Sequence, residues 1–306
     1  MSERSLHERV AEKYDHGCTD FMLAYGSGAV LQANTDKTRR NIVDYMFIVQ
    51  PEWVRQNMQA NPDDYSWIAK RCGPGITAGV QRLGRARMYY HPFISEGDDE
   101  IKYGSIFTDD FIDDLEHWIS LYPAGRMQKR TVTVKEPQDE RITAAIEANY
   151  YSAVRAARLL LPDEFSEQQL YEAIAGLSYT GDLRMKGGEN PHKVQNLVQG
   201  DLSGYRQIYC DRLQDLGVHE VGNNTYQQDT DDDTKAALCD ALPSGLRVRL
   251  PEVPDADDVS AALEKIVRWP SAFMGAKGLL YSTSWEGAKR YIREKREKRA
   301  RGMQAP

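Results

Sequence analysis

The sequence predicts an α+β fold: a first domain that mixes strands and helices, a second, helical domain, and a C-terminal helical segment. Over the first third of the 306 residues, apolar strand-like runs alternate with amphipathic stretches. From about residue 136 the apolar residues recur at helical spacing, with one short hairpin signal near residue 220. The length suffices for about two domains with cores of their own. We therefore expect domains over 1–135 and 136–245, followed by the segment 246–306.

Strand signals in the first domain come from β-branched and aromatic runs. The run IVDYMFIV at 42–49 is typical of a buried strand, and the apolar run 21–25 ends at Gly26-Ser27-Gly28. Two later runs, joined by a polar loop, predict a hairpin. Pro51 favours a helix start near residue 53, and a helical pattern covers 109–121. We predict strands over residues 21–25, 42–49, 87–94, 101–107 and 129–134, the last at a sheet edge.

Three helices are predicted for the second domain. The first covers 139–161 and stops before a proline. Ser166 and Gln169 have the spacing of a capping box, which predicts the start of a second helix over 167–177. The third begins at Pro191 and reaches about residue 216, because proline favours the first helical turn.

A hairpin and a C-terminal segment complete the predicted fold. Residues 218–228 predict the hairpin, with Asn223-Asn224 at its turn. Three helices followed by a hairpin are the outline of a winged helix. The acidic stretch 229–233 predicts a mobile loop, and helical patterns resume from Pro251 onward.

The composition argues against several classes of protein. The longest apolar runs are a few residues, far short of the roughly 20 that cross a bilayer. The four cysteines form no CxxC pair and the six histidines show no HExxH spacing, which argues against zinc sites and fits reduced thiols. The net charge of −7 disfavours general nucleic-acid binding, so we expect no nucleic-acid partner. The N-terminus predicts neither a signal peptide nor a transit peptide.

Gly26-Ser27-Gly28 is a candidate phosphate-binding turn, because glycines around a serine let backbone N–H groups and a hydroxyl approach a phosphate. A tight turn between a strand and a helix explains the same residues. The next strand favours the functional interpretation. Asp44 is the one acid within IVDYMFIV, and a buried carboxylate needs a basic partner, such as Arg39 or Arg40, or a metal ion. A Gly-Ser turn before a strand-borne acid is the arrangement of polymerase-β-type nucleotidyltransferases.

Further charged residues are candidate ligands of phosphate. Lys102 lies in the short strand signal IKYG and is a candidate triphosphate ligand, although a lysine on the exposed face of an edge strand is the alternative. Asp182 and Arg184 follow the second predicted helix of the helical domain, and Lys193 lies at the start of the third. Arg184 and Lys193 offer a guanidinium fork and a point charge for phosphate oxygens. Without further context, a solvated loop with a helix cap explains this cluster more simply.

Seven motifs follow one another along the chain. They are AYGSGAVLQ, VDYMFIV, MYYHPF, IKYGSI, DDLEHWISLYPAGRMQK, LPDEFSEQQLYEAIAGLSYTGDLRM and ENPHKVQNLV. Together they resemble the mitochondrial-type CDP-diacylglycerol synthases, described as the mitochondrial translocator assembly and maintenance protein family. The resemblance covers residues 21–209 and returns more weakly over 266–281.

This resemblance implies a polymerase-β-like nucleotidyltransferase domain followed by a winged helix. It also implies that CTP and phosphatidic acid are converted into CDP-diacylglycerol and pyrophosphate with Mg²⁺. Asp44 and Lys102 fall on the catalytic acid and the strand lysine, and Asp44 with Ser27 is expected to bind the metal. The residues that this match expects to bind nucleotide are Gly26, Ser27, Gly28, Lys102, Asp182, Arg184 and Lys193.

One departure from the wider superfamily concerns the second acid. The usual Asp-x-Asp pair is here Asp44-Tyr45-Met46, so only one acid of the pair is present. Asp36 is a candidate substitute, on a predicted loop rather than a strand. The second metal contact therefore stays open.

A lipid substrate requires contact with a membrane, and the C-terminal segment is the candidate for it. Between residues 289 and 301, eight Lys or Arg stand against two Glu. We expect this basic helix to bind an anionic membrane surface, with additional contact from apolar residues. Those on one face of the helix are Trp285, Ala288 and Ile292, and those before it are Phe273, Met274, Leu279 and Leu280. Without a recognisable transit peptide, we expect a cytoplasmic protein of a bacterium, peripheral on the inner face of the cell membrane.

Three other functions stay open at this point. They are a nucleotidyltransferase for another acceptor, a winged-helix DNA-binding regulator with an inactive first domain, and a membrane scaffold without activity. The acidic helical domain and the presence of the turn, Asp44 and Lys102 argue against the regulator. The sequence does not determine the oligomeric state.

Overall fold

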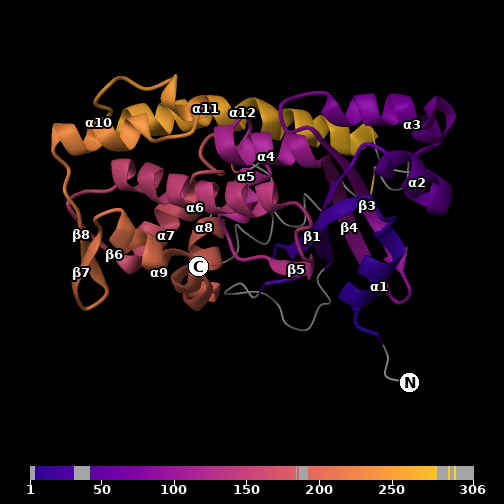
Figure 1. The fold of residues 1–306 in the computed structure, drawn as a ribbon, viewed down its shortest axis with the longest axis horizontal. Coiled ribbons are helices and arrows are strands. Elements are labelled where there is room, and N and C mark those ends of the chain that lie inside the picture. Colours follow the sequence, from indigo (N-terminus) through magenta and orange to yellow (C-terminus); the bar gives the residue numbers. More distant parts are fainter. Residues whose placement is uncertain are drawn as a thin grey trace.

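The computed structural model describes residues 4–30, 42–183, 185, 192–280, 289 and 293, and the structural statements below concern these residues. They form a mixed α+β fold, as predicted, with a five-stranded sheet and a three-stranded sheet. Figure 1 shows the two sheets toward opposite ends of the long axis, with a group of helices between them.

The larger sheet is built from the five strands that the sequence predicts. They are β1 (Thr19–Tyr25), β2 (Val43–Val49), β3 (Met88–Glu96), β4 (Asp99–Phe107) and β5 (Val132–Lys135). The strand order is β3-β4-β2-β1-β5. β2 and β4 are parallel, and the other neighbours are antiparallel, including the predicted hairpin β3–β4. β5 pairs with β1 at one end of the sheet, which confirms the predicted edge strand.

Side-chain alternation gives the larger sheet two apolar faces. On β2, Tyr45, Phe47 and Val49 pack in one core with α1 (Leu6–Tyr14) and α2 (Trp53–Ala60). Met46 and Ile48 point the other way, into a core shared with the helices of the second part. Successive strand residues alternate between faces, so the side chain of Asp44 lies on the same face as Met46. The acid therefore stands at the start of β2, on the side where the two parts meet.

Helix α3 (Trp67–Arg82) of the first part, like α1, is absent from the sequence-based prediction. It follows the short 3-10 helix Pro62–Asp64. Gly73 has a φ of 83°, which kinks α3 directly before Pro74. Glycine and proline are the weakest helix formers, so this pair hides the helical pattern in the sequence.

Helix α4 (Thr108–His117) ends earlier than predicted, because Trp118 adopts a left-handed conformation with a φ of 50°. The chain then turns back onto Asp114. Its carboxylate accepts hydrogen bonds from the backbone N–H groups of Ser120, at 2.6 Å, and Ala124, at 3.1 Å. Burial raises the pKa of Asp114. This turn begins the short helix α5 (Ala124–Met127), whose Arg126 lies over the ring of Tyr25 at the end of β1.

The second part contains four of the predicted features. Its elements are α6 (Glu140–Leu160), β6 (Glu164–Ser166), α7 (Glu167–Gly176), α8 (Lys193–Gly200), α9 (Leu202–Asp215), β7 (His219–Gly222) and β8 (Thr225–Gln227). The small sheet has the order β6-β8-β7. The first helix, the second helix, its capping box at Ser166 and the hairpin turn at Asn223-Asn224 are confirmed.

The predicted third helix is two helices, so its prediction as one continuous helix is wrong. α8 and α9 are separated at Asp201, which has a φ of −145°. The Asp201 carboxylate pairs with Arg130 at 2.9 Å and fills the space beside Gly204, where a Cβ would lie 2.4 Å from it. Pro191, the predicted start, lies outside the described residues.

Residues 229–231 of the acidic stretch lie in a loop, but Asp232 and Asp233 form the start of a helix, so the prediction of a loop over 229–233 is wrong for these two residues. Asp231 caps α10 (Asp232–Asp240) by accepting a hydrogen bond from the backbone N–H of Thr234 at 2.6 Å. Aspartates are favourable at this position because the N-terminus of a helix carries partial positive charge. The short helix α11 (Ser244–Arg247) follows.

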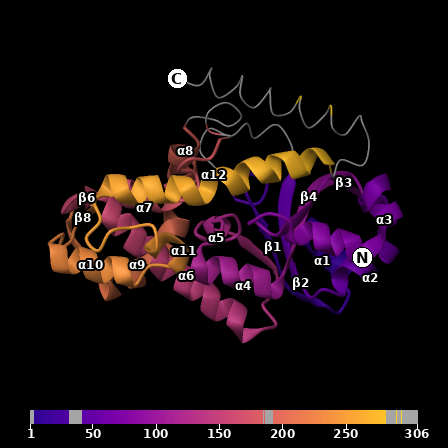
Figure 2. The ribbon, with the colours of Figure 1, turned by 90° about the horizontal axis from the view of Figure 1, so that it is seen from above.

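The C-terminal helix α12 (Ala256–Leu280) confirms the predicted helical segment and contacts both parts of the protein, at α6 and at β3 (Figure 2). The buried Lys277 ammonium donates hydrogen bonds to the carbonyls of Gln81, Leu83 and Met88, at 3.1, 2.9 and 3.0 Å. Burial lowers the pKa of Lys277 to about 8. In the described part of the chain, no helix combines the length and apolar character needed to cross a membrane.

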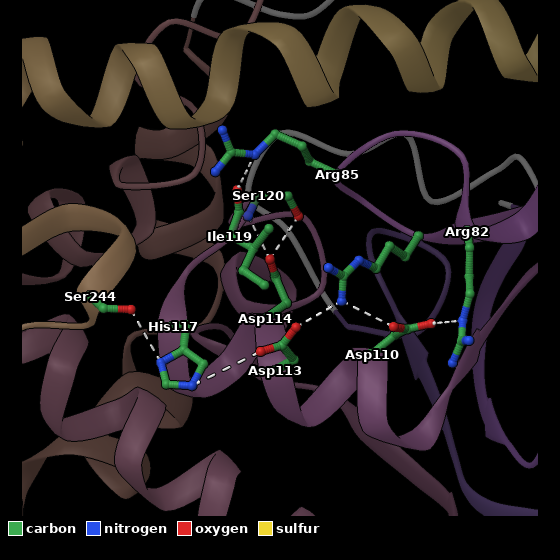
Figure 3. Close-up of polar contacts among 10 residues, drawn as sticks. Arg82, Arg85, Asp110, Asp113, Asp114, His117, Ile119, Ser120 and Ser244 are labelled. Atoms are coloured by element: carbon green, nitrogen blue, oxygen red, sulfur yellow. Dashed lines mark hydrogen bonds and ion pairs between the residues drawn. The ribbon is translucent and has the colours of Figure 1, made fainter. Parts of the chain in front are cut away.

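A chain of polar contacts holds the segment before β3 against α4 and α11. Asp110 on α4 pairs with Arg82 at 2.9 Å and with Arg87 at 3.0 Å, and Arg87 also pairs with Asp113 at 2.7 Å. Figure 3 shows His117 lying between Asp113 and Ser244, so this series of polar contacts reaches α11. These contacts fix the end of α3 and the start of β3 relative to α4.

Candidate functional site

The Gly26-Ser27-Gly28 turn directly follows β1, as predicted. Gly26 has a φ of +76°, a conformation that glycine adopts without strain. At Gly28 a Cβ would lie 2.5 Å from the carbonyl oxygen of Ile42, so this position admits no side chain. Ser27, between the two glycines, is exposed. The turn thus presents its serine outward while its backbone packs tightly against the start of β2.

Asp44 lies against this turn. In the antiparallel pair β1–β2 its register partner is Tyr25, the residue before the turn. A Cβ on Gly26 would lie 3.3 Å from the Asp44 carboxylate. The Asp44 carboxylate is half-buried and accepts a hydrogen bond from the Tyr90 hydroxyl at 3.1 Å. Arg39 and Arg40, the alternative partners named from the sequence, lie outside the described residues, as does Asp36.

Lys102 is brought next to Asp44 by the parallel pairing of β2 and β4, in which the two residues are register partners. Neighbouring strands are roughly 5 Å apart, so both side chains rise from adjacent points on one face. β4 lies between β3 and β2, which excludes the alternative of a lysine on an edge strand. The Lys102 ammonium lies 4.5 Å from the centre of the Phe93 ring and is half-buried.

Two tyrosines that the sequence analysis did not single out line the same face. The hydroxyls of Tyr25 and Tyr90 lie 2.9 Å apart, and Tyr90 donates to Asp44. Burial raises the pKa of Tyr25 to about 12 and that of Tyr90 well above its ordinary value, so both are neutral donors. Gly104 makes room for Tyr90, because a Cβ there would lie 3.1 Å from its ring.

Two cations from the end of α5 continue the site toward the second part. The Arg126 guanidinium lies over the rings of Tyr122, at 3.7 Å, and Tyr25, at 5.2 Å. The Lys129 ammonium donates to the carbonyl of Gly125 and to the hydroxyl of Ser178, the latter at 3.0 Å. The sequence-based prediction includes neither of these cations. The available signal was the basic cluster in the motif YPAGRMQK, which follows a predicted helix and has no helical pattern of its own.

The second part contributes Lys193 to this site. The ammonium groups of Lys129 and Lys193 lie over the ring of Tyr179, at 5.2 and 5.5 Å. Burial, together with the charges of Arg126 and Lys193, lowers the pKa of Lys129 to about 7. Three basic side chains thus gather where α5, the end of α7 and the start of α8 meet.

The other two predicted residues of the second part have different positions. Asp182 is buried, and its backbone N–H donates to the carbonyl of Tyr179 at 3.0 Å. The neighbouring Gly181 approaches α12 so closely that a Cβ would lie 2.7 Å from the Cα of Glu264. Asp182 therefore stands within the packed loop beside the cations rather than at an open surface. Arg184 lies outside the described residues.

Asp44 is suited to a metal ion that also takes ligands from substrate and water. Among the described residues, no three His, Cys, Asp or Glu side chains gather to form a metal site. A Mg²⁺ ion is commonly held by one or two carboxylates together with substrate phosphates and water. Asp44 beside a candidate phosphate-binding turn fits that pattern.

The predicted membrane-contacting tail is largely outside the described residues. This includes Trp285, Ala288, Ile292 and most of the basic residues, while Lys289 and Arg293 are exposed. Phe273 is 40% exposed beside Gly84, but Met274 is buried in the core, so its predicted membrane contact is wrong. The side chains of Leu279 and Leu280 are not among those described.

Known proteins resemble this chain over most of its length. The family described as "Phosphatidate cytidylyltransferase, mitochondrial" matches residues 7–256. The protein of that name from Bos taurus is 36% identical over 235 residues, which are 76% of this chain and 70% of the bovine protein. Its counterpart from Danio rerio is 33% identical over 86% of this chain and 79% of its own. That from Schizosaccharomyces pombe is 30% identical over 86% of this chain and 71% of its own.

These relatives correct the expected location. We expected a cytoplasmic bacterial protein on the inner face of the cell membrane, because no transit peptide was recognised. The similar proteins are eukaryotic and are named mitochondrial, so that expectation is wrong. The family match covers more than half of the chain, and it agrees with the motifs found in the sequence. The chain belongs to the family of mitochondrial phosphatidate cytidylyltransferases.

Proposed function

We propose that this chain is a phosphatidate cytidylyltransferase, which converts CTP and phosphatidic acid into CDP-diacylglycerol and pyrophosphate. The membership of the family supports the reaction and the two substrates. The observation that carries the proposal is the meeting of the glycine turn, Asp44 and Lys102 on one face of the larger sheet. These residues provide a phosphate-binding backbone, a carboxylate and an ammonium group within one short stretch of surface.

The residues divide into two roles in this proposal. The backbone N–H groups of Gly26, Ser27 and Gly28 and the ammonium of Lys102 bind the triphosphate of CTP, because both supply donors to phosphate oxygens. Asp44, with the hydroxyl of Ser27, would hold a magnesium ion, which supplies charge neutralisation for the triphosphate when bound. The hydroxyl of Tyr90 orients the Asp44 carboxylate through their hydrogen bond.

In the helical part, we propose that Asp182, Arg184 and Lys193 contribute to nucleotide binding. Lys193 is supported by its position over Tyr179, beside the cations of α5. Asp182 is buried, so its role would be to position the loop that carries Arg184 rather than to contact the nucleotide directly.

The chemistry requires no general base. The second pKa of a phosphate monoester is about 6, so the acceptor phosphate is a dianion near pH 7. One of its oxygens forms a bond to the α-phosphorus of CTP. The bond from that phosphorus to the bridging oxygen breaks, and pyrophosphate leaves with the electron pair. The most conspicuous buried histidine, His91, is not needed for this step, and burial lowers its pKa to about 4.

The main obstacle is the repulsion between two polyanions. Two unit charges about 4 Å apart repel by roughly 4 kcal/mol at an effective dielectric constant of about 20. The ammonium and guanidinium groups of Lys102, Arg126, Lys129 and Lys193 offset this repulsion before the reaction begins. They are held in place by aromatic rings and hydrogen bonds, so little reorganisation is needed when the substrates bind.

We also propose the finer fold assignment and the domain limits. Residues 1–135 form a polymerase-β-like nucleotidyltransferase domain and 136–245 a winged-helix domain, with a C-terminal segment over 246–306. The first assignment is supported by the turn, acid and lysine on a mixed sheet. The second is supported by helices α6, α7 and α9 with the small sheet β6-β8-β7.

Contact with the membrane is proposed through the basic C-terminal segment. A substrate with two acyl chains stays in the bilayer, and each basic residue near an anionic surface contributes about 1 kcal/mol to binding. Trp285, Ala288 and Ile292 would add apolar contact, in addition to that of the exposed Phe273. Truncation after Tyr281 should reduce sedimentation with phosphatidic acid vesicles, and binding of the intact chain should weaken with salt. Equal binding by both chains would refute this role.

One assay tests the proposed reaction. Pure protein is incubated with labelled CTP, magnesium and phosphatidic acid, and lipid-soluble label is identified as CDP-diacylglycerol. The variant Asp44→Asn should lose about 100-fold or more in turnover, because the carboxylate charge is removed while the shape is kept. The matched control is Asp98→Asn, an exposed acid in the β3–β4 turn. Normal turnover by Asp44→Asn would refute the role of Asp44, and no product from the unmodified chain would refute the reaction.

A further inference from the structure

Arg126, on α5, and Lys129, two residues after its end, are two basic side chains held by neutral groups. In the part of the chain that the structure describes, neither group forms an ion pair with a carboxylate, and the Nε atom of Arg126 is buried without a hydrogen-bond partner. Their partners are instead carbonyls, a hydroxyl and the faces of aromatic rings. Both groups are half-buried. Charged groups removed from water without a counter-charge are costly, which indicates a place for an anionic ligand.

The surroundings hold these two cations in fixed positions. Gly125 lies so close to Ser178 that a Cβ on Gly125 would stand 2.2 Å from the Cβ of the serine. This close approach joins α5 to the end of α7 and places the Lys129 ammonium between the Gly125 carbonyl and the Ser178 hydroxyl. The guanidinium of Arg126 lies over the ring of Tyr122, 3.7 Å from its centre. The site therefore exists before any ligand arrives.

One residue, Tyr25, connects Arg126 and Lys129 to the elements proposed to bind the nucleotide. The ring of Tyr25 contacts the Arg126 guanidinium on α5, while the backbone of Tyr25 pairs with Asp44 and leads into the glycine turn. The turn, Asp44 and Lys102 lie on β1, β2 and β4, whereas Arg126 and Lys129 approach from the helical side. Two groups of residues suited to anions are thus connected through Tyr25.

We propose that Arg126 and Lys129 bind the phosphomonoester head of the lipid acceptor, next to the elements that bind the triphosphate. This assignment rests on the proposed function, which requires two phosphate-bearing substrates. A guanidinium fork and a point charge match a dianionic terminal phosphate in both charge and number of donors. The pair would place an oxygen of that phosphate toward the α-phosphorus of a nucleotide held at the glycine turn.

The assignment is tested by separating the two substrates. Kinetics are measured with dioctanoyl phosphatidic acid, a soluble acceptor, and with CTP varied independently. Lys129→Met and Arg126→Met should each raise KM for the acceptor by about tenfold or more, since each removes charge-assisted hydrogen bonds. KM for CTP should change less than about twofold. The matched control is Lys70→Met, which removes an exposed lysine of α3 that pairs with Asp63 at 3.6 Å.

A second measurement keeps the assignment testable if a variant folds poorly or if the reaction differs. Binding of dioctanoyl phosphatidic acid without CTP is followed by calorimetry, with dioctanoylglycerol, which lacks the phosphate, as the control ligand. Lys129→Arg retains the charge and should restore most of the binding that Lys129→Met loses. A rise in KM for CTP equal to or larger than that for the acceptor would overturn the assignment, as would unchanged acceptor binding. Phosphate-dependent binding without formation of CDP-diacylglycerol would instead contradict the proposed reaction and leave this site standing.

Discussion

Asp44 and Lys102 stand opposite each other in the parallel pair β2–β4, with both side chains on the face that carries Tyr25 and Tyr90. The hydroxyl of Tyr90 holds the Asp44 carboxylate, and the ring of Phe93 lies beneath the Lys102 ammonium. Each group therefore has a neighbour that sets its direction while it stays half-buried. A carboxylate suited to a metal and an ammonium suited to a phosphate are thus fixed roughly one strand spacing apart.

Lys102→Met should weaken the use of CTP. Methionine keeps much of the length of the side chain but removes its charge, so triphosphate oxygens lose a charge-assisted hydrogen bond. We expect KM for CTP to rise by about tenfold or more, with a smaller change in KM for the lipid acceptor. Steady-state kinetics with each substrate varied in turn measure the two effects. An unchanged KM for CTP would contradict the proposed role, provided that Lys70→Met behaves like the unmodified chain.

Gly28→Ala should disturb both the turn and the acid beside it. The added Cβ would lie 2.5 Å from the carbonyl oxygen of Ile42 and 2.8 Å from the Cα of Val43, so the start of β2 must shift. Overpacking of this kind costs about 1–3 kcal/mol of stability, and we expect turnover to fall by more than tenfold because Asp44 moves with the strand. Thermal unfolding and product formation measure the two effects. Gly79→Ala is the control, since a Cβ there meets open space; equal behaviour of the two variants would argue against the tight turn.

Much of the fold follows from local sequence patterns. The five strands of the larger sheet were predicted because β-branched and aromatic runs mark them, and the capping box at Ser166 marks a helix start directly. Local patterns fail where one residue changes the backbone direction. Gly73 and Pro74 hide α3, and Asp201 divides a helix that looks continuous in sequence. The acidic run 229–233 does not distinguish a loop from a helix start, because aspartates are frequent in loops and are also favourable as helix caps.

The candidate site shows a different limit. Gly26 to Gly28, Asp44 and Lys102 were found because each interrupts a recognisable strand signal. Their nearness depends on the parallel pairing of β2 with β4, which no local pattern specifies. Arg126 and Lys129 were missed because they lie in a short turn without periodicity. Their importance comes from tertiary contacts with Tyr25, Ser178 and Tyr179, and from the fact that neither cation forms an ion pair with an acid in the described part of the chain.

Lys277→Met should loosen the attachment of α12 to the first part. The ammonium of Lys277 is the donor for three backbone carbonyls, and methionine would leave them without it. Leaving buried acceptors without a donor costs about 1–3 kcal/mol, so the midpoint of urea unfolding should fall. Lys265→Met, on an exposed position of the same helix, is the control and should change little. If both variants unfold at the same urea concentration as the unmodified chain, Lys277 does not fasten the helix.

The acceptor site should depend on pH through Lys129. Its ordinary pKa near 10.5 is lowered to about 7 by burial and by the charges of Arg126 on α5 and Lys193 on α8, with the Tyr179 ring and the Ser178 hydroxyl as its other neighbours. The free site therefore binds the extra proton below about pH 7 and loses it as the pH rises. The phosphate monoester is already a dianion above about pH 6, so its own titration does not weaken binding in this range.

The expected result is a KM for dioctanoyl phosphatidic acid that rises between about pH 7 and pH 9, with proton uptake when the acceptor binds. Lys129→Arg should flatten this dependence, because a guanidinium stays charged throughout the range. The uptake is measured as the difference in binding enthalpy between two buffers of unequal ionisation enthalpy. A KM that is constant over this range in the unmodified chain, or a rise that persists in Lys129→Arg, would show that another group titrates and that Lys129 does not bind the phosphate as a cation.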